Sequence, residues 1–222
     1  MSQRREIKDR LFEQFARIGQ AMSSSKRLEL LDLLSQCEKD VETLASNSGM
    51  SVANTSRHLL ILKAAGLVES RKEGVHNFYH LANQEVVELY CGLRELAERQ
   101  LADVEKIVDE LYPGEERMEP VDRRQLIKLA KAGAVTVLDV RPEDEFRAAH
   151  LPHAISVPLP KLKSYLKELP KHRQVVAYCR GPYCLMASEA IKLLQSKGYK
   201  AIRLGEGIVE WQAAGLPLVH GS

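Results

Sequence analysis

The segment over residues 113–120 separates two halves of the chain that differ in their hydrophobic pattern. Its sequence, Pro-Gly-Glu-Glu-Arg-Met-Glu-Pro, holds two prolines, a glycine and otherwise mostly charged residues, a composition that interrupts helices and strands. Before it, apolar residues recur at helical spacing, and after it short apolar runs alternate with helical stretches. The sequence therefore predicts two domains, over 1–112 and 121–222, joined by a linker at 113–120.

The overall composition is that of a globular protein without a membrane span. The 222 residues are 45% hydrophobic and 28% charged, and no apolar run approaches the roughly 18 residues that cross a bilayer. The beginning of the sequence is charged and lacks an apolar signal core, so we expect a cytoplasmic protein with no membrane partner.

The cysteines are too few for a disulfide scaffold in a chain of this size. In a reducing compartment such thiols are inert, catalytic or redox-sensing. The four cysteines are Cys37, Cys91, Cys179 and Cys184.

The first half has the spacing of a helix-turn-helix followed by a hairpin. A turn at Ser48-Gly49-Met50 joins two short helices, and its glycine suits a helix end. Two strand-like runs then flank a polar segment that contains Gly74, which predicts a β-hairpin, or wing. The expected elements are helices over 4–20, 25–36, 40–47, 51–64 and 84–111, and strands over 67–70 and 77–81.

The second helix of such a motif enters the major groove of DNA with polar and basic side chains at its beginning. We expect wing residues to contact phosphates or the minor groove. A solvated helical face is the alternative interpretation. Leu59, Leu60, Leu62 and Leu67 are expected to pack inward or toward the preceding helix. The residues expected to face DNA are Ser51, Asn54, Thr55, Ser56, Arg57 and His58 on the helix and Arg71, Lys72 and His76 on the wing.

The charge is distributed unevenly. Residues 1–112 carry 15 basic and 18 acidic residues, whereas residues 113–222 carry 17 and 12. A DNA-binding half that is acidic overall must gather its basic residues on one face. Arg57, Lys63, Arg71 and Lys72 lie in the reading elements, as this requires.

Several short motifs in residues 5–110 together resemble the arsenical-repressor (ArsR/SmtB) family. They are Lys-Arg-Leu at 26–28, Val-Glu-Thr-Leu-Ala at 41–45, the run at 51–59, Leu-Lys-Ala-Ala-Gly-Leu-Val at 62–68 and the run at 74–81. The resemblance implies a winged-helix homodimer, paired through its first and last helices. Such a dimer represses by occupying double-stranded operator DNA until an inducer weakens binding.

The chain departs from the metal-responsive members of that family. Those members use a cysteine pair near the third helix, or histidine and carboxylate ligands on the last helix. Here the first region has only Cys37, and residues 84–111 contain no histidine, so we expect no metal. Cys37 and Cys91 fit either a redox pair, as in sulfide-responsive relatives, or simple packing residues.

The second half alternates strands and helices, which predicts a parallel sheet covered by helices on both faces. The expected strands are 135–140, 175–178 and 200–204, with an apolar segment at 154–157, and the expected helices are 122–132, 143–148, 161–168, 185–196 and 206–214. The fold class is therefore α/β overall, with a mostly helical winged helix-turn-helix before an α/β domain.

A buried-strand pattern at 175–178 ends at Cys179 and turns through Gly181 and Pro182 into a helix near Leu185. The strand fixes the position of the sulfur. Backbone N–H groups of the loop and the positive end of the helix then face any anion that the sulfur carries. This arrangement stabilises a thiolate or a persulfide.

Motifs over 120–219 resemble the rhodanese (sulfurtransferase) domain. They are Val-Leu-Asp-Val-Arg-Pro at 137–142, Glu-Phe at 145–146, His-Leu-Pro-His-Ala at 150–154, Tyr-Cys-Arg-Gly at 178–181, Gly-Tyr at 198–199 and Leu-Gly-Glu-Gly at 204–207. The resemblance implies that Cys179 accepts sulfane sulfur from thiosulfate, polysulfide or a persulfide, without a cofactor. The loop amides are expected to lower its pKa. The loop comprises Cys179, Arg180, Gly181, Pro182, Tyr183 and Cys184.

The length of this loop favours sulfur over phosphate. Related phosphatases use a longer loop that ends in arginine, and position 185 here is leucine. Cys184 stands where relatives have Arg, Ser or Thr, and it fits either a thiol that resolves the persulfide or a passive small residue. Arg180 fits either a guide for anionic donors or a solvated cation.

Polar residues near the loop are expected to support it rather than to react. Asp139, Arg141 and Glu145 are predicted to lock the loop by hydrogen bonds and ion pairs. His150 and His153 are predicted to have structural roles.

The leading hypothesis is a transcriptional repressor whose second domain senses or relays reactive sulfur through a Cys179 persulfide. The alternative is a thiosulfate or persulfide sulfurtransferase that carries an autoregulatory DNA-binding domain. A third interpretation makes the second half an inactive interaction module. Whether the protein is an enzyme is left open by the sequence.

Overall fold

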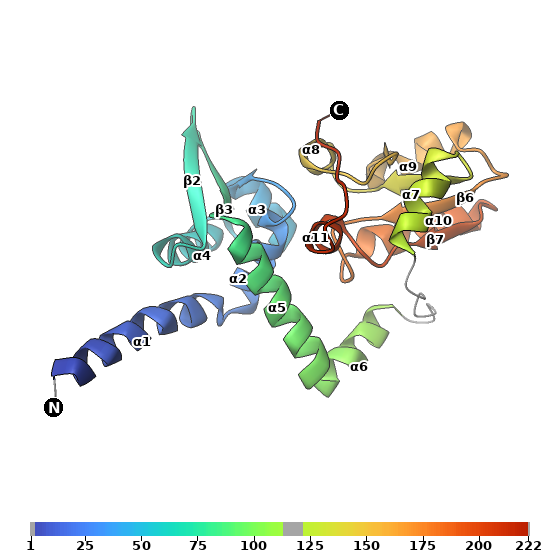
Figure 1. The fold of residues 1–222 in the computed structure, drawn as a ribbon. Coiled ribbons are helices and arrows are strands. Elements are labelled where there is room, and N and C mark those ends of the chain that lie inside the picture. Colours follow the sequence, from blue (N-terminus) through green and yellow to red (C-terminus); the bar gives the residue numbers. More distant parts are fainter. Residues whose placement is uncertain (1–2, 113–121, 222) are drawn as a thin grey trace. The chain divides into compact units, whose positions relative to one another are not determined.

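The computed structural model describes residues 3–112 and 122–221, which divide into two compact units, Met1–Leu96 and Ala97–Ser222 (Figure 1). The linker predicted at 113–120 lies outside the described residues. The division falls within a helix, so Ala97–Tyr112 belong with the second unit rather than with the first.

The first unit is a winged helix-turn-helix. Its small antiparallel sheet has the strand order β1-β3-β2, with Ser70 opposite Tyr79 in the wing hairpin. The first strand was not expected from the sequence and pairs Lys39 with Tyr79. The elements are α1 (Gln3–Met22), α2 (Ser25–Leu34), β1 (Lys39–Asp40), α3 (Val41–Ser48), α4 (Val52–Ala64), β2 (Val68–Glu73), β3 (His76–Leu81) and α5 (Gln84–Gln100).

Local capping fixes the helix-turn-helix. The Asp40 side chain accepts a hydrogen bond from Thr43 N at 2.7 Å and so caps α3, and the Ser51 side chain caps α4 in the same way through Asn54 N. Gly49 ends α3 with φ 64°, a left-handed conformation that favours glycine. These three residues set where α3 begins and ends and where α4 begins.

The core of the first unit lies among α2, α3, α4 and the sheet, and it includes Leu30, Leu44, Leu59 and Leu62. The expectation that Leu60 packs inward is wrong, since this residue is 60% exposed. Leu59 and Leu62 share one helical face, and Leu60 lies about 100° away from Leu59 around the axis.

The predicted long helix over 84–111 is wrong in one respect, because it is two helices. α5 ends at Gln100, Leu101 is extended with φ −109° and ψ 101°, and α6 (Ala102–Leu111) then begins. The apolar spacing continues through the break, and neither proline nor glycine marks it. Asp103 in the first turn of α6 favours a helix beginning there, because its negative charge meets the positive end of the helix.

The second unit contains a four-stranded parallel sheet in the order β5-β4-β6-β7. Val137 in β4 lies opposite Val176 in β6, which makes these two strands the centre of the sheet. The elements after α6 are α7 (Arg123–Lys131), β4 (Val135–Asp139), α8 (Glu143–Ala148), β5 (Ile155–Ser156), α9 (Leu159–Tyr165), the 3-10 turn η1 (Leu166–Glu168), β6 (Gln174–Tyr178), α10 (Leu185–Ser196), β7 (Ala201–Arg203) and α11 (Ile208–Ala213).

Helices cover both faces of this sheet, as the alternation predicted (Figure 1). One core places Leu138 and Ala177 of the strands with Leu194 of α10. The other places Val176 with Trp211 of α11 and includes α7. Successive strand residues face opposite sides, so each strand contributes to both cores.

Among the described residues, no helix is long and apolar enough to cross a membrane.

Gly207, just before α11, lets the backbone that follows β6 pass very close. A Cβ built at Gly207 would lie 2.4 Å from the carbonyl oxygen of Arg180 and 2.8 Å from that of Cys179. Both neighbours are backbone atoms, which cannot turn aside as a side chain can. Glycine is therefore required here to seat the loop that begins at Cys179.

We expect Gly207→Ala to destabilise the second unit by about 1–3 kcal/mol, because the added methyl group must displace backbone. Urea unfolding of the full chain, followed by fluorescence of Trp211, the single buried tryptophan, measures this directly. Gly205→Ala is the control, since a Cβ there meets no atom within 4 Å. Equal loss of stability in both variants would contradict the explanation.

Candidate functional site

The loop from Cys179 to Cys184 joins the carboxyl end of β6 to the beginning of α10. The Cys179 side chain is 2% exposed, and its Sγ lies 3.2 Å from the carbonyl oxygen of Cys184 and 4.0 Å from that of Gly181. Cys184 N donates to Gly181 O at 3.3 Å and so tightens the turn. The loop therefore folds back until its two thiols are neighbours.

The two thiols differ in acidity, in the opposite sense to the prediction. Burial, together with the hydrogen bond to Cys184, raises the pKa of Cys179 well above its ordinary value, and the amides of Ala187 and Gly181 oppose this only in part. The hydrogen bond from Cys179 lowers the pKa of Cys184 to about 7, and the amides of Arg180 and Met186 act in the same direction. Of the two thiols, Cys184 is therefore the one that ionises more readily.

The Arg180 side chain points inward, onto a carboxylate from α8. Its Nε and Nη2 atoms donate to Glu145 at 3.0 and 2.6 Å, while Glu145 is fully buried and Arg180 is 13% exposed at its side chain. Arg180 is thus neither a solvated cation nor placed to meet a donor in solution. A buried carboxylate needs a paired cation, so this ion pair holds the beginning of the loop against α8.

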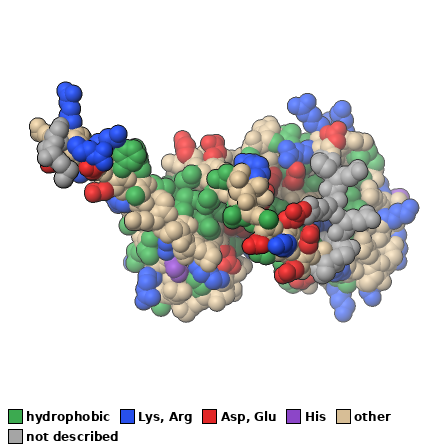
Figure 2. Space-filling view, turned by 90° about the horizontal axis from the view of Figure 1, so that it is seen from below, with side chains coloured by type: hydrophobic (Ala, Val, Ile, Leu, Met, Phe, Trp, Pro, Cys, Tyr) green, Lys and Arg blue, Asp and Glu red, His purple; other side chains and the backbone are tan. Residues whose placement is uncertain are grey.

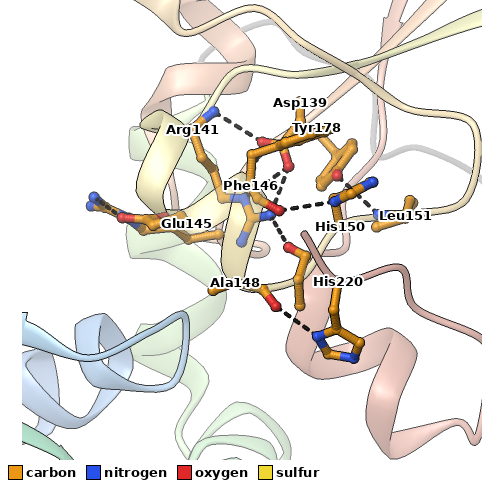
Figure 3. A network of polar contacts seen from close by, with 11 residues as sticks. Asp139, Arg141, Glu145, Phe146, Ala148, His150, Leu151, Tyr178 and His220 are labelled. Atoms are coloured by element: carbon orange, nitrogen blue, oxygen red, sulfur yellow. Dashed lines mark hydrogen bonds and ion pairs between the residues drawn. The ribbon is translucent and has the colours of Figure 1, made fainter. Parts of the chain in front are cut away.

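A second buried ion pair lies beside the loop at the end of β4 (Figure 3). Arg141 Nη2 donates to Asp139 at 2.6 Å and to the carbonyl of Ala149 at 2.7 Å, and both charged side chains are fully buried. The Tyr178 ring lies 5.6 Å from the Arg141 guanidinium, and its hydroxyl accepts from Leu151 N at 3.1 Å. Burial raises the pKa of Tyr178, so its hydroxyl stays protonated.

His150 and His153 lie in the turn after α8. The His150 ring stacks on Phe146 with centroids 3.8 Å apart, and its Nδ1 lies 2.9 Å from the Phe146 carbonyl oxygen. Figure 3 shows His150 within the polar network that includes Asp139, Arg141 and Tyr178. His153 adopts a left-handed φ of 64° in the turn. This geometry favours the structural roles expected for both.

The predicted DNA-reading residues of α4 are exposed or half-buried, except for Thr55. Ser51 and Arg57 are exposed, and Asn54, Ser56 and His58 are half-buried. Thr55 is fully buried and its hydroxyl donates to Ser51 O at 3.1 Å, so the expectation that it faces DNA is wrong. Its position on the helix places it with the core residue Leu59, one turn later.

Arg27 of α2 lies near the reading helix, which the sequence did not indicate, and its guanidinium donates to the carbonyls of Ala21 and Gln20. The pKa of His58 is lowered by burial and by the positive charges of Arg27 and Arg57. Three basic side chains from two helices therefore lie near one another. Only the folded structure brings Arg27 to the reading helix.

The basic residues of the wing differ in how strongly they are paired with carboxylates. Arg71 pairs with Glu38 at 2.8 Å and also with Glu73, and its guanidinium lies 4.8 Å from the Phe78 ring centroid. Lys72 and His76 are exposed. Lys72 would reach a DNA phosphate more readily than Arg71, because Arg71 would have to leave two carboxylates to bind DNA.

The remaining two cysteines lie in the first unit and are not joined by a disulfide. Cys37 is half-buried and accepts a hydrogen bond from Lys39 Nζ at 3.3 Å, and Cys91 is buried in α5. Their role as a redox pair stays a prediction.

Within the part of the chain that the structure describes, one group offers three ligand atoms of the kind that bind metal. Asp40, Glu42 and His76 place such atoms within 4.8 Å of one another, where the beginning of α3 lies near the turn of the wing hairpin. Asp40 is already engaged as the cap of α3, and burial opposes the hydrogen bonds to Thr43 that lower its pKa. The sequence did not bring these residues together.

Large apolar side chains are exposed along α1 and α5. In Figure 2 green hydrophobic side chains are visible along α1 and on the adjoining surface of the first unit. Such unpartnered apolar stripes on two helices are typical of surfaces that pack against another chain. The exposed residues are Ile7, Leu11, Phe12 and Phe15 of α1 and Leu89, Leu93 and Leu96 of α5.

Comparison with protein families identifies both units. The bacterial regulatory protein, arsR family, matches residues 24–70, and the rhodanese-like domain matches residues 122–214. An HTH-type transcriptional regulator of Mycobacterium tuberculosis, Rv0324, is 40% identical over 212 residues, which are 96% of this chain and 93% of that protein.

Other relatives match one unit each. A sulfurtransferase of Allochromatium vinosum is 32% identical over 93 residues, covering 41% of this chain and 85% of that protein. A solved structure, the homodimeric winged helix-turn-helix DNA-binding domain of Mb0332 from Mycobacterium bovis, is 38% identical, with a TM-score of 0.42, and the match covers 46% of this chain and 93% of that one.

The thiol pair predicts a specific pH dependence. The rate of Cys184 alkylation by iodoacetamide should rise with a midpoint of about pH 7, because the thiolate is the reacting form. Cys179→Ala should move this midpoint upward, since it removes the donor that stabilises the thiolate. Mass spectrometry of the loop peptide measures both. Cys37→Ala is the control, and a midpoint unchanged in Cys179→Ala would contradict the assignment.

The exposed Arg57 on α4 predicts a DNA contact. Arg57→Ala should weaken binding to a fragment of the chain's own promoter by about 1–3 kcal/mol if it contacts a base edge. Fluorescence anisotropy at one fixed salt concentration measures this. Arg124→Ala, which removes an exposed charge from the second unit, should leave affinity within about twofold, the size expected away from the interface. If both variants weakened binding equally, the loss of one positive charge would explain the result, and a specific Arg57 contact would be contradicted.

Proposed function

The chain belongs to the arsR family of bacterial regulatory proteins and carries a rhodanese-like domain, and from this we propose that it is a repressor that releases DNA in response to reactive sulfur. The observation that carries the proposal is the pair of neighbouring thiols in one loop, Cys179 and Cys184. A regulator needs a signal that changes its structure, and a dithiol offers two stable states.

The first step is sulfur transfer to Cys179. With hydrogen disulfide, HSS⁻, as donor, the Cys184 thiolate takes the proton of Cys179, and the Cys179 sulfur attacks the protonated sulfur of the donor. The S–S bond of the donor breaks, and Cys184 returns the proton to the departing sulfide as HS⁻. The product is a Cys179 persulfide with Cys184 again a thiolate. The lowered pKa of Cys184 suits it to carry this proton near neutral pH.

The second step resolves the persulfide. The Cys184 thiolate attacks the inner sulfur of Cys179–S–SH, the bond to the outer sulfur breaks, and HS⁻ leaves with the electron pair. The product is a Cys179–Cys184 disulfide. The donor sulfur is reduced to sulfide and the two thiols are oxidised, so no further oxidant is needed. The proximity of Cys179 Sγ to the backbone of Cys184 favours this step.

The DNA-binding form is proposed to be a homodimer joined through α1 and α5. The exposed apolar residues of these helices support this, since a monomer would leave them in water. A symmetric dimer presents two α4 helices to two half-sites, which a single short reading helix needs for useful specificity.

The second candidate function is sulfur transfer as an end in itself. The 32% identity to a sulfurtransferase favours it. A thiol at position 184 argues against rapid turnover, because Cys184 would trap the Cys179 persulfide as a disulfide before an acceptor arrived. High turnover with thiosulfate and cyanide, unaffected by DNA, would favour the enzyme over the sensor.

The proposal is tested by binding of the full chain to its promoter fragment before and after polysulfide treatment. Wild type should bind when reduced and lose at least tenfold in affinity when treated, a coupling of about 1.4 kcal/mol. Cys179→Ser should bind and not respond. Cys37→Ser and Cys91→Ser should respond as wild type does.

Each variant separates one explanation from another. Loss of the response in Cys37→Ser or Cys91→Ser alone would move the sensor to the first unit. An equal response in Cys179→Ser and wild type would refute the proposed sensor.

A further inference from the structure

Tyr112 follows α6 and belongs to the second unit. Its side chain is only 7% exposed, although it lies next to a strongly charged stretch of sequence. A tyrosine that is buried usually has a specific partner for its hydroxyl. Here the partner is in the loop from Cys179 to Cys184, which we call the sulfur loop.

The Tyr112 hydroxyl donates to the carbonyl oxygen of Pro182 at 2.7 Å. Arg203, at the end of β7, donates through Nη1 to the same oxygen at 3.3 Å, and its guanidinium lies 4.1 Å from the Tyr112 ring centroid. The ring is therefore held by a cation on its face, and two donors converge on one carbonyl. That carbonyl lies in the middle of the loop that carries both thiols.

A second contact joins the next loop residue to the same stretch of chain. The Tyr183 hydroxyl donates to Glu98 Oε1 at 2.6 Å, and Glu98 lies in the last turn of α5. Pro182 and Tyr183 are thus both bonded to residues within Ala97–Tyr112. This stretch continues directly from the part of α5 that belongs to the first unit.

We propose that Tyr112 is a positioning residue that couples the state of the sulfur loop to the α5–α6 segment, an inference that rests on the proposed function. Joining Cys179 to Cys184 closes a ring of loop residues, and the Pro182 peptide lies within that ring. A hydrogen bond to a carbonyl weakens steeply as its direction changes, so reorientation of this peptide releases the Tyr112 hydroxyl.

The release has a direct path into α6. Tyr112 N donates to Val108 O at 3.1 Å and so closes the last turn of that helix. When the ring loses its hydroxyl partner, the helix end that it anchors is no longer held to the loop. A neutral hydrogen bond contributes about 0.5–1.5 kcal/mol, which corresponds to a coupling of roughly 2- to 12-fold in affinity.

The test compares Tyr112→Phe with Tyr199→Phe in the full chain. Tyr199 is the matched control, because it is equally buried in the same unit and its hydroxyl also donates to a backbone carbonyl, that of Leu166, which is far from the loop in sequence. Promoter affinity is measured for each variant when reduced and after polysulfide treatment. The pH midpoint of Cys184 alkylation is measured alongside, because a residue that only fills space would not move it.

Tyr112→Phe is expected to lose most of the polysulfide-induced change in affinity and to shift the Cys184 midpoint, while Tyr199→Phe retains both wild-type values. A wild-type response and midpoint in Tyr112→Phe would overturn the inference. The same loss in both tyrosine variants would also overturn it, since general destabilisation would then explain the result.

The outcome is separable from failure of the proposed function. If wild type itself does not respond to polysulfide, the sensor fails and the coupling with it. If wild type responds through Cys179 while Tyr112→Phe responds equally, only the coupling through Tyr112 fails.

Discussion

The sulfur site depends on the buried ion pair between Glu145 and Arg180. Glu145 is fully buried, and a carboxylate in that position is tolerated only with a cation held against it. Arg180 supplies that cation by turning inward immediately after Cys179, which commits the backbone that follows to a tight path. Gly207 makes this path possible, because any larger residue would meet the carbonyls of Cys179 and Arg180. The loop geometry is therefore set by an ion pair and a close approach, rather than by the reactive sulfur.

Within that frame the two thiols have different tasks. Cys179 is buried at the end of β6 and keeps its proton, whereas Cys184 at the beginning of α10 is the more acidic of the two. This division suits a site that receives one sulfur atom and then expels it as sulfide when the Cys179–Cys184 disulfide forms. It would suit continuous turnover poorly, because a persulfide formed on Cys179 would have the more acidic Cys184 thiol beside it. The Pro182 carbonyl of the same loop accepts a hydrogen bond from Tyr112. The two thiols therefore share a loop with a residue that is bonded to the segment following α5.

The sequence predicts the strand, loop and helix around Cys179 because a buried apolar run, a Gly-Pro turn and a helical pattern follow one another locally. It does not predict the break at Leu101, since the apolar spacing runs through it. It also fails for the direction of Arg180, whose partner Glu145 is 35 residues away and is brought near only by the fold. Thr55 shows the same limit on a smaller scale, because a polar residue that bonds to its own helix can be buried.

The most direct test of a sulfur-controlled repressor is to follow loop chemistry and DNA occupancy in the same sample. Wild-type protein bound to its promoter fragment is titrated with polysulfide, and at each point the fraction bound is compared with the mass of the peptide that contains Cys179 and Cys184. The account predicts that DNA release parallels the appearance of the Cys179 persulfide and then of the Cys179–Cys184 disulfide, with sulfide released. Release of DNA while this peptide remains fully reduced would contradict it.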